Sequence, residues 1–119
     1  MNRVVSTLLF FTLSLSIAAA KEYNISSFGA VGDGLTMNTL AIQKAIDAAH
    51  NGGGGKVVIP SGEFLTGSII LKSGVELHLK RRATLIGSTK KSDYFRLNRW
   101  YALILADSAR NISITGKGV

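Results

Sequence analysis

The sequence SFGAVGDGLTMNTLAIQKAIDAAHNGGGGKVVIP, residues 27–60, organises the rest of this chain. It holds a glycine-rich turn, a helical pattern, a four-glycine break and a strand-like run that ends in proline. The helical pattern is one apolar stripe at period 3.6, formed by Ala41, Ile42, Ala45, Ile46 and Ala49. Thr36 or Asn38 can serve as the N-cap. Asn51-Gly52 is typical of a helix end, so the stripe predicts one helix of about 12 residues. A single helix of this length covers a small apolar surface, as a lid would.

The two glycine-rich segments do not match nucleotide-binding loops. A dinucleotide fingerprint that starts at Gly32 needs glycine where Met37 stands. A phosphate-binding loop needs serine or threonine after Lys56, where the sequence has Val57, and it needs a strand before the glycines instead of a helix. We therefore expect turns at both places, with Asp33 in a structural hydrogen-bonding role and no cofactor.

From residue 57 onward the chain has the pattern of short strands. Apolar or alternating runs predict six of them, at 57–60, 64–71, 75–79, 83–87, 101–106 and 111–115. Spacing of this kind is typical of an all-β sandwich, a barrel or a solenoid. Several runs are apolar at successive positions, which fits strands covered on both faces. The turns between them also lack the Asn-Gly and Asp-Gly pairs of tight hairpins. Both features favour an all-β parallel solenoid with one helix.

The first twenty residues have the layout of a secretory signal peptide. Residues 1–3 carry a positive charge, 4–17 are mostly apolar, and the alanines at 18–20 are small enough for cleavage. The alternative, a membrane anchor, is disfavoured because the apolar run is shorter than the ~20 residues that span a bilayer. We expect a signal peptide at 1–20 and a mature chain at 21–119. The mature chain would be exported, to the periplasm or outside the cell, without membrane association.

The charge of the chain indicates which classes of partner it can bind, and its cysteine content indicates how the fold is stabilised. The sequence has 14 Lys+Arg against 7 Asp+Glu, a formal net charge of +7. A basic balance favours anionic partners, namely nucleic acid, lipid headgroups or acidic polysaccharide. Export makes nucleic acid the least favoured of these, and a surface that only aids solubility is the alternative. The chain has no cysteine, so its stability must come from packing and not from disulfides.

No group of residues in the sequence has the pattern of a catalytic or metal site. The carboxylates are dispersed, His50 and His78 are isolated, and no serine or threonine lies in a nucleophile-elbow motif. The best substrate-binding candidates are Arg99, Trp100 and Tyr101, because aromatic rings with arginine can stack on sugars and pair with carboxylates. The alternative for these three is a loop whose aromatic side chains pack onto the core.

Several motifs resemble the N-terminal region of polygalacturonase-like glycoside hydrolases of family 28. They are FGAVGDG (28–34), AIQKAIDAA (41–49), GGGGKVVIPSGEFLTGSI (52–69) and NISITGKGV (111–119), and the resemblance extends over 23–119. The first three also resemble the wider pectate-lyase-like group, which includes epimerases. The resemblance implies a right-handed parallel β-helix with an N-terminal capping helix, and inverting hydrolysis of galacturonan by aspartates. We expect the full-length form to be a monomer, and the family's acidic substrate, galacturonan, would suit a basic protein.

The sequence departs from the family pattern in three ways. Met37 stands where the family's D-G-x-T-D motif has aspartate, and Arg81-Arg82 stands where small residues are usual. The family's catalytic segments Asn-Thr-Asp, Asp-Asp, His-Gly and Arg-x-Lys are absent from this sequence. Asn38-Thr39 matches only the start of the first segment, because leucine follows where that segment has aspartate. We therefore expect a pectin-degrading hydrolase in full-length form, with no catalytic residue in this chain.

The same resemblance makes residues 21–119 the cap and first rungs of an incomplete β-helix. Such a stack would present a bare apolar cross-section, so we expect the chain alone to be insoluble or poorly folded. The alternatives to a hydrolase are a non-hydrolytic β-helix protein of the pectate lyase or epimerase kind and a carbohydrate-binding module.

Overall fold

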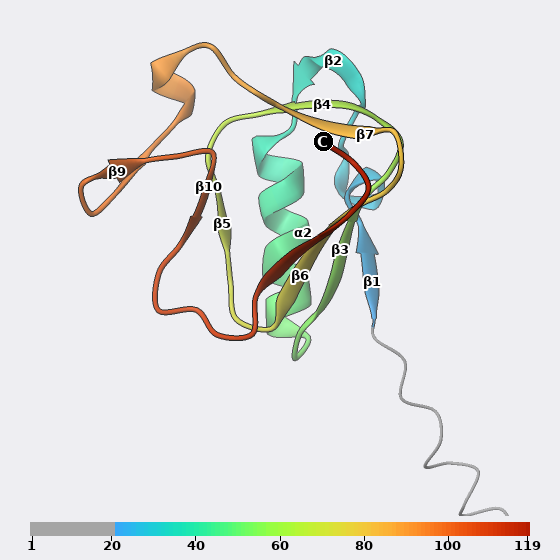
Figure 1. Cartoon of the computed structure of the whole chain (residues 1–119), viewed down its shortest axis with the longest axis vertical. Helices are drawn as coiled ribbons and strands as arrows, with labels where there is room; N and C mark the ends of the chain where they lie inside the picture. The colour runs from blue at the N-terminus through green and yellow to red at the C-terminus, as the bar shows by residue number, and fades with distance from the viewer. Residues whose placement is uncertain (1–20) are drawn as a thin grey trace, which may run out of the picture.

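The computed structural model describes residues 21–119, which form mostly strands and one α-helix (Figure 1). The helix is α2 (Thr39–Asn51), and the 3₁₀ helices are η1 (Ile25–Phe28) and η2 (Lys91–Asp93). The strands are β1 (Glu22–Asn24), β2 (Asp33–Met37), β3 (Gly55–Ile59), β4 (Gly62–Thr66), β5 (Ile69–Leu71), β6 (Val75–Leu79), β7 (Ala83–Gly87), β8 (Arg96–Leu97), β9 (Trp100–Tyr101), β10 (Ile104–Ala106) and β11 (Ser113–Gly116). The prediction of a mostly β fold with one α-helix is confirmed for these residues. The signal peptide predicted at 1–20 lies outside the described residues.

Three sheets of parallel strands build the body of the protein. The first sheet has the order β1-β3-β6-β11, the second β2-β4-β7 and the third β10-β5. The chain passes through the first, second and third sheets in that order from β3 to β5, and again from β6 to β10, before it returns to the first sheet at β11. Strands that are distant in sequence therefore lie side by side in register, with Val57 beside Leu77 and Ile59 beside Leu79.

The apolar core lies between the sheets and the helix. Its strand members are Val57, Ile59, Phe64, Ile69, Leu71, Val75, Leu77, Leu79 and Ala83. Burial of each large apolar side chain stabilises the fold by about 1.5–3 kcal/mol. In β3, three successive residues, Val57, Val58 and Ile59, are buried, as its continuous apolar run predicts for a strand covered on both faces.

Helix α2 packs its apolar stripe against this core. All five predicted stripe residues are buried, and the helix contacts β1, β3 and β5. Asn38 occupies the N-cap position, but its side chain makes no capping hydrogen bond, so the capping role predicted for it is wrong. Its Oδ1 instead accepts a hydrogen bond from the N–H of Val31 at 2.8 Å. Its Nδ2 donates to the carbonyls of Val31, Thr36 and Leu65. The side chain thus ties the glycine-rich turn to β4. No helix within residues 21–119 has the length and apolar character needed to cross a membrane.

Helix α2 also pairs, through the side chain of Gln43, with the edge of β5 that has no neighbouring strand within residues 21–119. Gln43 Oε1 accepts from the N–H of Ile70 at 2.8 Å, and its Nε2 donates to the carbonyl of Ile70 at 3.0 Å. The side-chain amide therefore pairs with both backbone groups of one edge residue, as a neighbouring strand would. Nε2 also donates to Asp47, which forms an ion pair with Lys72 at 2.7 Å. Partial burial alone would raise the pKa of Asp47, but the hydrogen bonds from Lys72 and Gln43 and the nearby positive charges hold it below its usual value.

The substitution Gln43→Leu keeps the size of this side chain and removes both hydrogen bonds to β5. We expect it to lower the free energy of unfolding by about 1–2 kcal/mol, because the polar groups of Ile70 lose their partner while water can reach them only in part. Urea-dependent proteolysis of the chain fused to a soluble carrier measures the change. Lys44→Leu, at an exposed neighbour on the same helix, is the control and should stay within about 0.5 kcal/mol. Equal losses in both variants would contradict the role given to Gln43.

Two predicted strands are wrong in their extent. The run at 64–71 forms two strands, β4 and β5, which lie in different sheets because the chain bends at Gly67 and Ser68. A side chain at Gly67 would collide with the backbone carbonyl of Asp93, so this bend needs glycine. The run at 101–106 likewise divides between β9 and β10. The segment predicted as a glycine-rich turn contains β2, which pairs with β4.

Candidate functional site

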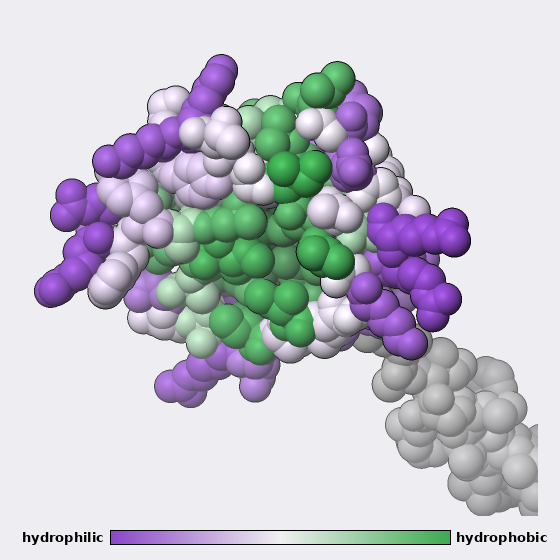
Figure 2. Space-filling view, turned by 45° about the horizontal axis from the view of Figure 1, so that its top comes forward, coloured by the Kyte–Doolittle hydropathy of each residue, from purple (hydrophilic) through white to green (hydrophobic). Residues whose placement is uncertain are grey.

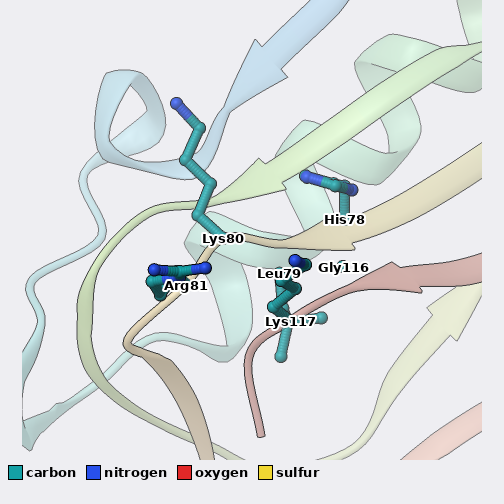
Figure 3. Close-up of a pocket in the computed structure, with 6 residues that line it drawn as sticks. All are labelled: His78, Leu79, Lys80, Arg81, Gly116 and Lys117. Atoms are coloured by element: carbon teal, nitrogen blue, oxygen red, sulfur yellow. The ribbon is translucent and has the colours of Figure 1, made fainter.

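A pocket of about 590 Å³ opens where β6 and β11 end, side by side in the first sheet (Figure 3). Two short segments supply its lining, which consists of His78, Leu79, Lys80, Arg81, Gly116 and Lys117. The volume falls within the range of roughly 300–1,000 Å³ that is typical of ligand pockets. In Figure 3, the Lys80 side chain extends away from the end of β6 on the same side as His78, whereas the Lys117 side chain overlaps Leu79 and Gly116 in this view. The pocket therefore combines an apolar surface with a basic border.

Gly116 allows the two strand ends to approach closely. It pairs with Leu79, and its φ of 104° lies in the left-handed region that favours glycine. A side chain at this position would collide with the backbone carbonyl of Leu79. That carbonyl accepts hydrogen bonds from the N–H groups of Lys117 at 3.0 Å and Gly118 at 3.2 Å. The tight turn thus holds Lys117 next to the end of β6.

Three basic residues border the pocket without an acidic partner. Lys80, Arg81 and Lys117 are exposed. The ion pairs found within residues 21–119 involve other residues, and no carboxylate lines the pocket. Cations without a partner keep their positive field available to an anionic ligand, at short range because salt screens it.

A hydrogen-bonded chain of Glu76, Thr115 and His78 lies beside the pocket. Thr115 Oγ1 donates to Oε2 of Glu76 at 2.6 Å, and Nδ1 of His78 lies 2.7 Å from Thr115 Oγ1. The hydroxyl has a single proton, which goes to the carboxylate, so Nδ1 must donate in the bond to Thr115. In a nucleophilic triad the imidazole accepts the hydroxyl proton, and this arrangement is therefore not a triad. It fixes the His78 ring and leaves Nε2 as the nitrogen available to a ligand.

The predicted substrate-binding residues lie elsewhere. Arg99, Trp100 and Tyr101 belong to the β8–β9 hairpin within residues 88–103, which extends from the body between β7 and β10 (Figure 1). Trp100 is 66% exposed and Tyr101 is 49% exposed, which disfavours the alternative that these rings pack onto the core. Lys91 Nζ lies 5.2 Å from the centre of the Tyr101 ring. None of the three lines the pocket, and their role in substrate binding stays a prediction.

Sequence reasoning did not single out Lys80, Arg81 or Lys117 as site residues. The one available signal was Arg81-Arg82 in place of small residues. Lys117 joins the others through the register of β6 and β11, which no local pattern in the sequence reveals.

Asp33 has the structural role predicted for it. Its carboxylate accepts from the N–H groups of Thr36 and Leu35 and from the Thr36 hydroxyl, and these bonds lower its pKa. In the part of the chain that the structure describes, no three His, Asp or Glu side chains gather as a metal-binding group.

Comparison with known proteins gives consistent matches. A model of the family described as rhamnogalacturonase A/epimerase, pectate lyase-like, matches residues 23–96. An exo-poly-alpha-D-galacturonosidase of Dickeya chrysanthemi is 38% identical over 119 aligned residues, which cover 86% of this chain and 19% of that protein. The structure of a family 28 exopolygalacturonase of Yersinia enterocolitica has a TM-score of 0.73 and 39% identity, and the match covers 83% of this chain and 20% of that one. Mannuronan C5-epimerase AlgE1 of Azotobacter vinelandii is 45% identical over 64 residues, which cover 47% of this chain and 5% of that protein.

These matches confirm the predicted resemblance to polygalacturonase-like glycoside hydrolases. The chain spans 19% of the length of the Dickeya relative. Because the family model matches well over half of its residues, the chain belongs to the rhamnogalacturonase A/epimerase, pectate lyase-like family.

Proposed function

We propose that this chain is part of a protein that hydrolyses galacturonan, the acidic chain of pectin. The observation that carries the proposal is the similarity to an exo-poly-alpha-D-galacturonosidase over 86% of the chain. The basic border of the pocket supports it, because galacturonan bears a carboxylate on each sugar and would meet unpaired cations there. The catalytic segments that the resemblance implies are absent from this sequence, so these residues contribute structure and binding, and the chain alone has no hydrolytic activity.

The fold proposed for the whole domain is a right-handed parallel β-helix with α2 as its N-terminal cap. Repeated passage of the chain through three parallel sheets in one order supports successive coils. Val119 extends this order, since it donates to the carbonyl of Ala83 at 2.9 Å and accepts from Leu85 at 2.8 Å, beside β7 of the second sheet. Right-handedness rests on the strong general preference of parallel crossover connections.

We also propose that residues 1–20 direct export, to the periplasm or outside the cell, because their charge and apolar run have the signal-peptide layout. Pectin is an extracellular polymer, so export would bring the protein to its substrate. The mature full-length protein is proposed to act as a monomer.

Release of reducing ends from polygalacturonate tests the hydrolase. The 119-residue chain is expected to release none above the blank. The DNA downstream of the Val119 codon is read first, and a frame that continues into Asn-Thr-Asp and Asp-Asp segments supplies a longer protein for the same assay. That longer protein is expected to release reducing ends. A longer protein that binds polygalacturonate and releases none would contradict hydrolysis.

A second candidate function is a lyase or epimerase that acts on an acidic polysaccharide. The similarity to mannuronan C5-epimerase AlgE1 over 64 residues favours it. A lyase leaves unsaturated sugar ends that absorb ultraviolet light, whereas an epimerase inverts a sugar centre without shortening the chain. Incubation of the longer protein with polygalacturonate and with alginate, followed by ultraviolet absorbance and NMR of the sugars, separates these outcomes from hydrolysis.

A further inference from the structure

We propose that the pocket bordered by Lys80, Arg81 and Lys117 binds an acidic polysaccharide and recognises its uronate carboxylates. The inference rests on the proposed function for the class of ligand, and it adds the site and the residues. The pocket has the volume of a ligand site, three exposed basic residues and no carboxylate in its lining.

The placement of the cations favours a polymer over a small anion. Lys80 and Arg81 follow β6, whereas Lys117 follows β11, and the two lysine side chains extend in different directions from their strand ends (Figure 3). A single phosphate or carboxylate is bound tightly by donors that converge on it, as in a bidentate arginine fork. Cations that point apart suit a ligand whose negative charges are also spaced apart, and a polyuronate carries one on every sugar.

The rest of the lining suits a sugar ring between the charges. Leu79 and Gly116 form the apolar floor of the pocket, and little of Leu79 is exposed because its side chain belongs to the core. The His78 ring is held by Thr115 through Nδ1, which leaves Nε2 to bond a sugar hydroxyl. Glu76, the acidic group behind this ring, accepts the Thr115 hydroxyl proton and does not line the pocket. The site therefore offers groups for both the carboxylates and the ring.

The backbone that carries the cations is fixed before a ligand arrives. The turn after β6 is closed by a hydrogen bond from the N–H of Ala83 to the carbonyl of Lys80 at 2.9 Å. Arg82 in this turn has a φ of 69°, an uncommon value for a residue with a side chain. Its carbonyl accepts from the N–H of Gly62 at 3.1 Å, which holds that conformation. A turn already ordered in the free protein loses less entropy when a ligand binds.

The experiment measures binding of the full chain, fused to a soluble carrier, to polygalacturonate by affinity electrophoresis. The site variant combines Lys80→Gln, Arg81→Gln and Lys117→Gln. The matched control combines Lys44→Gln, Lys90→Gln and Arg110→Gln, which removes two exposed lysines and one exposed arginine from other parts of the surface. The two variants have the same net charge, and circular dichroism checks that both are folded.

The site variant is expected to bind polygalacturonate about tenfold more weakly than the unsubstituted chain, and the control within about twofold. Binding of the unsubstituted chain should weaken as salt rises and should be absent with neutral dextran. Equal weakening in both variants would overturn the site, because net charge alone would explain it. Binding to dextran, or to double-stranded DNA as tightly as to polygalacturonate, would overturn uronate recognition. Binding and chain cleavage are measured in separate assays. A binding result that overturns the site therefore leaves the proposed hydrolase untouched, and a longer protein that releases no reducing ends leaves the binding result valid.

Discussion

Replacing Asn38 with leucine is expected to lower the free energy of unfolding by about 3 kcal/mol, a large share of the ~5–15 kcal/mol of a small domain. The side chain is 1% exposed. It accepts from the N–H of Val31 and donates to the carbonyls of Val31, Thr36 and Leu65. Leucine has the same branching and the same number of side-chain heavy atoms, so the core would stay filled while these backbone groups lost their partner. The loss would free the glycine-rich turn from β4, and with it the start of α2.

Urea-dependent proteolysis of the carrier fusion measures this loss, and Asn51→Leu is its control. Asn51 is exposed at the end of α2, so its substitution should change the free energy of unfolding by less than about 0.5 kcal/mol. A loss below about 1 kcal/mol for Asn38→Leu would contradict the role given to this side chain.

The variant Asn38→Asp adds a test that depends on pH. It keeps the acceptor for Val31 but places a carboxylate against carbonyl oxygens, which raises the pKa of the new carboxyl in the folded state. The folded state then binds the proton more tightly than the unfolded state. The loss in free energy of unfolding, relative to the unsubstituted chain, should therefore shrink as pH falls from about 7 to about 4. A loss that is the same at both pH values would argue against burial of this group among acceptors.

Local patterns in the sequence were sufficient for the helix and for most strands. The stripe from Ala41 to Ala49 gave α2 its buried face, and Asn51-Gly52 marked its end. The apolar runs predicted the positions of β3, β6 and β7. Each run is apolar because its strand faces the core, where register pairs such as Val57 and Leu77 place side chains next to each other. The bend at Gly67 was missed since its cause is tertiary, namely the close approach of the Asp93 carbonyl. The hydrogen bonds of Asn38 were missed for the same reason, because a local pattern cannot distinguish a cap from a long-range tie.

The candidate site was beyond the reach of sequence patterns. Basic side chains are common on surfaces, and Lys117 lies far along the chain from Lys80. Only the pairing of Gly116 with Leu79 brings them to one pocket. Trp100 and Tyr101 stood out in the sequence because exposed aromatic residues near arginine are unusual, and the structure leaves them on a hairpin outside this pocket.

One face of the protein is unusually apolar for a surface. Figure 2 shows a broad hydrophobic area there, with hydrophilic residues around it. A hollow of about 320 Å³ is lined by apolar side chains from the last strands and the loops beside them, among them Leu79, Leu85, Leu103, Ile104, Ile114 and Val119. Ile114 is 55% exposed and Val119 is 84% exposed. Strands β11 and β10 are each the last strand of their sheet, and beyond β7 only Val119 pairs with the strand, so unpaired backbone groups accompany this apolar surface and make it prone to association.

Expressed without a carrier, the chain is therefore expected mainly in the insoluble fraction, and Ile114→Gln with Val119→Gln is expected to raise its soluble share roughly twofold or more. The reason is local: both substitutions reduce a contiguous apolar surface next to open strand edges. Leu35→Gln with Leu40→Gln is the matched control, since these leucines are 82% and 76% exposed at other places. Soluble and insoluble yields by gel, with sizes from analytical ultracentrifugation, give the comparison. Equal gains from both pairs would mean that overall hydrophobicity, and not this face, drives aggregation. A soluble monomer with cooperative unfolding before any substitution would show that the open face does not need a cover.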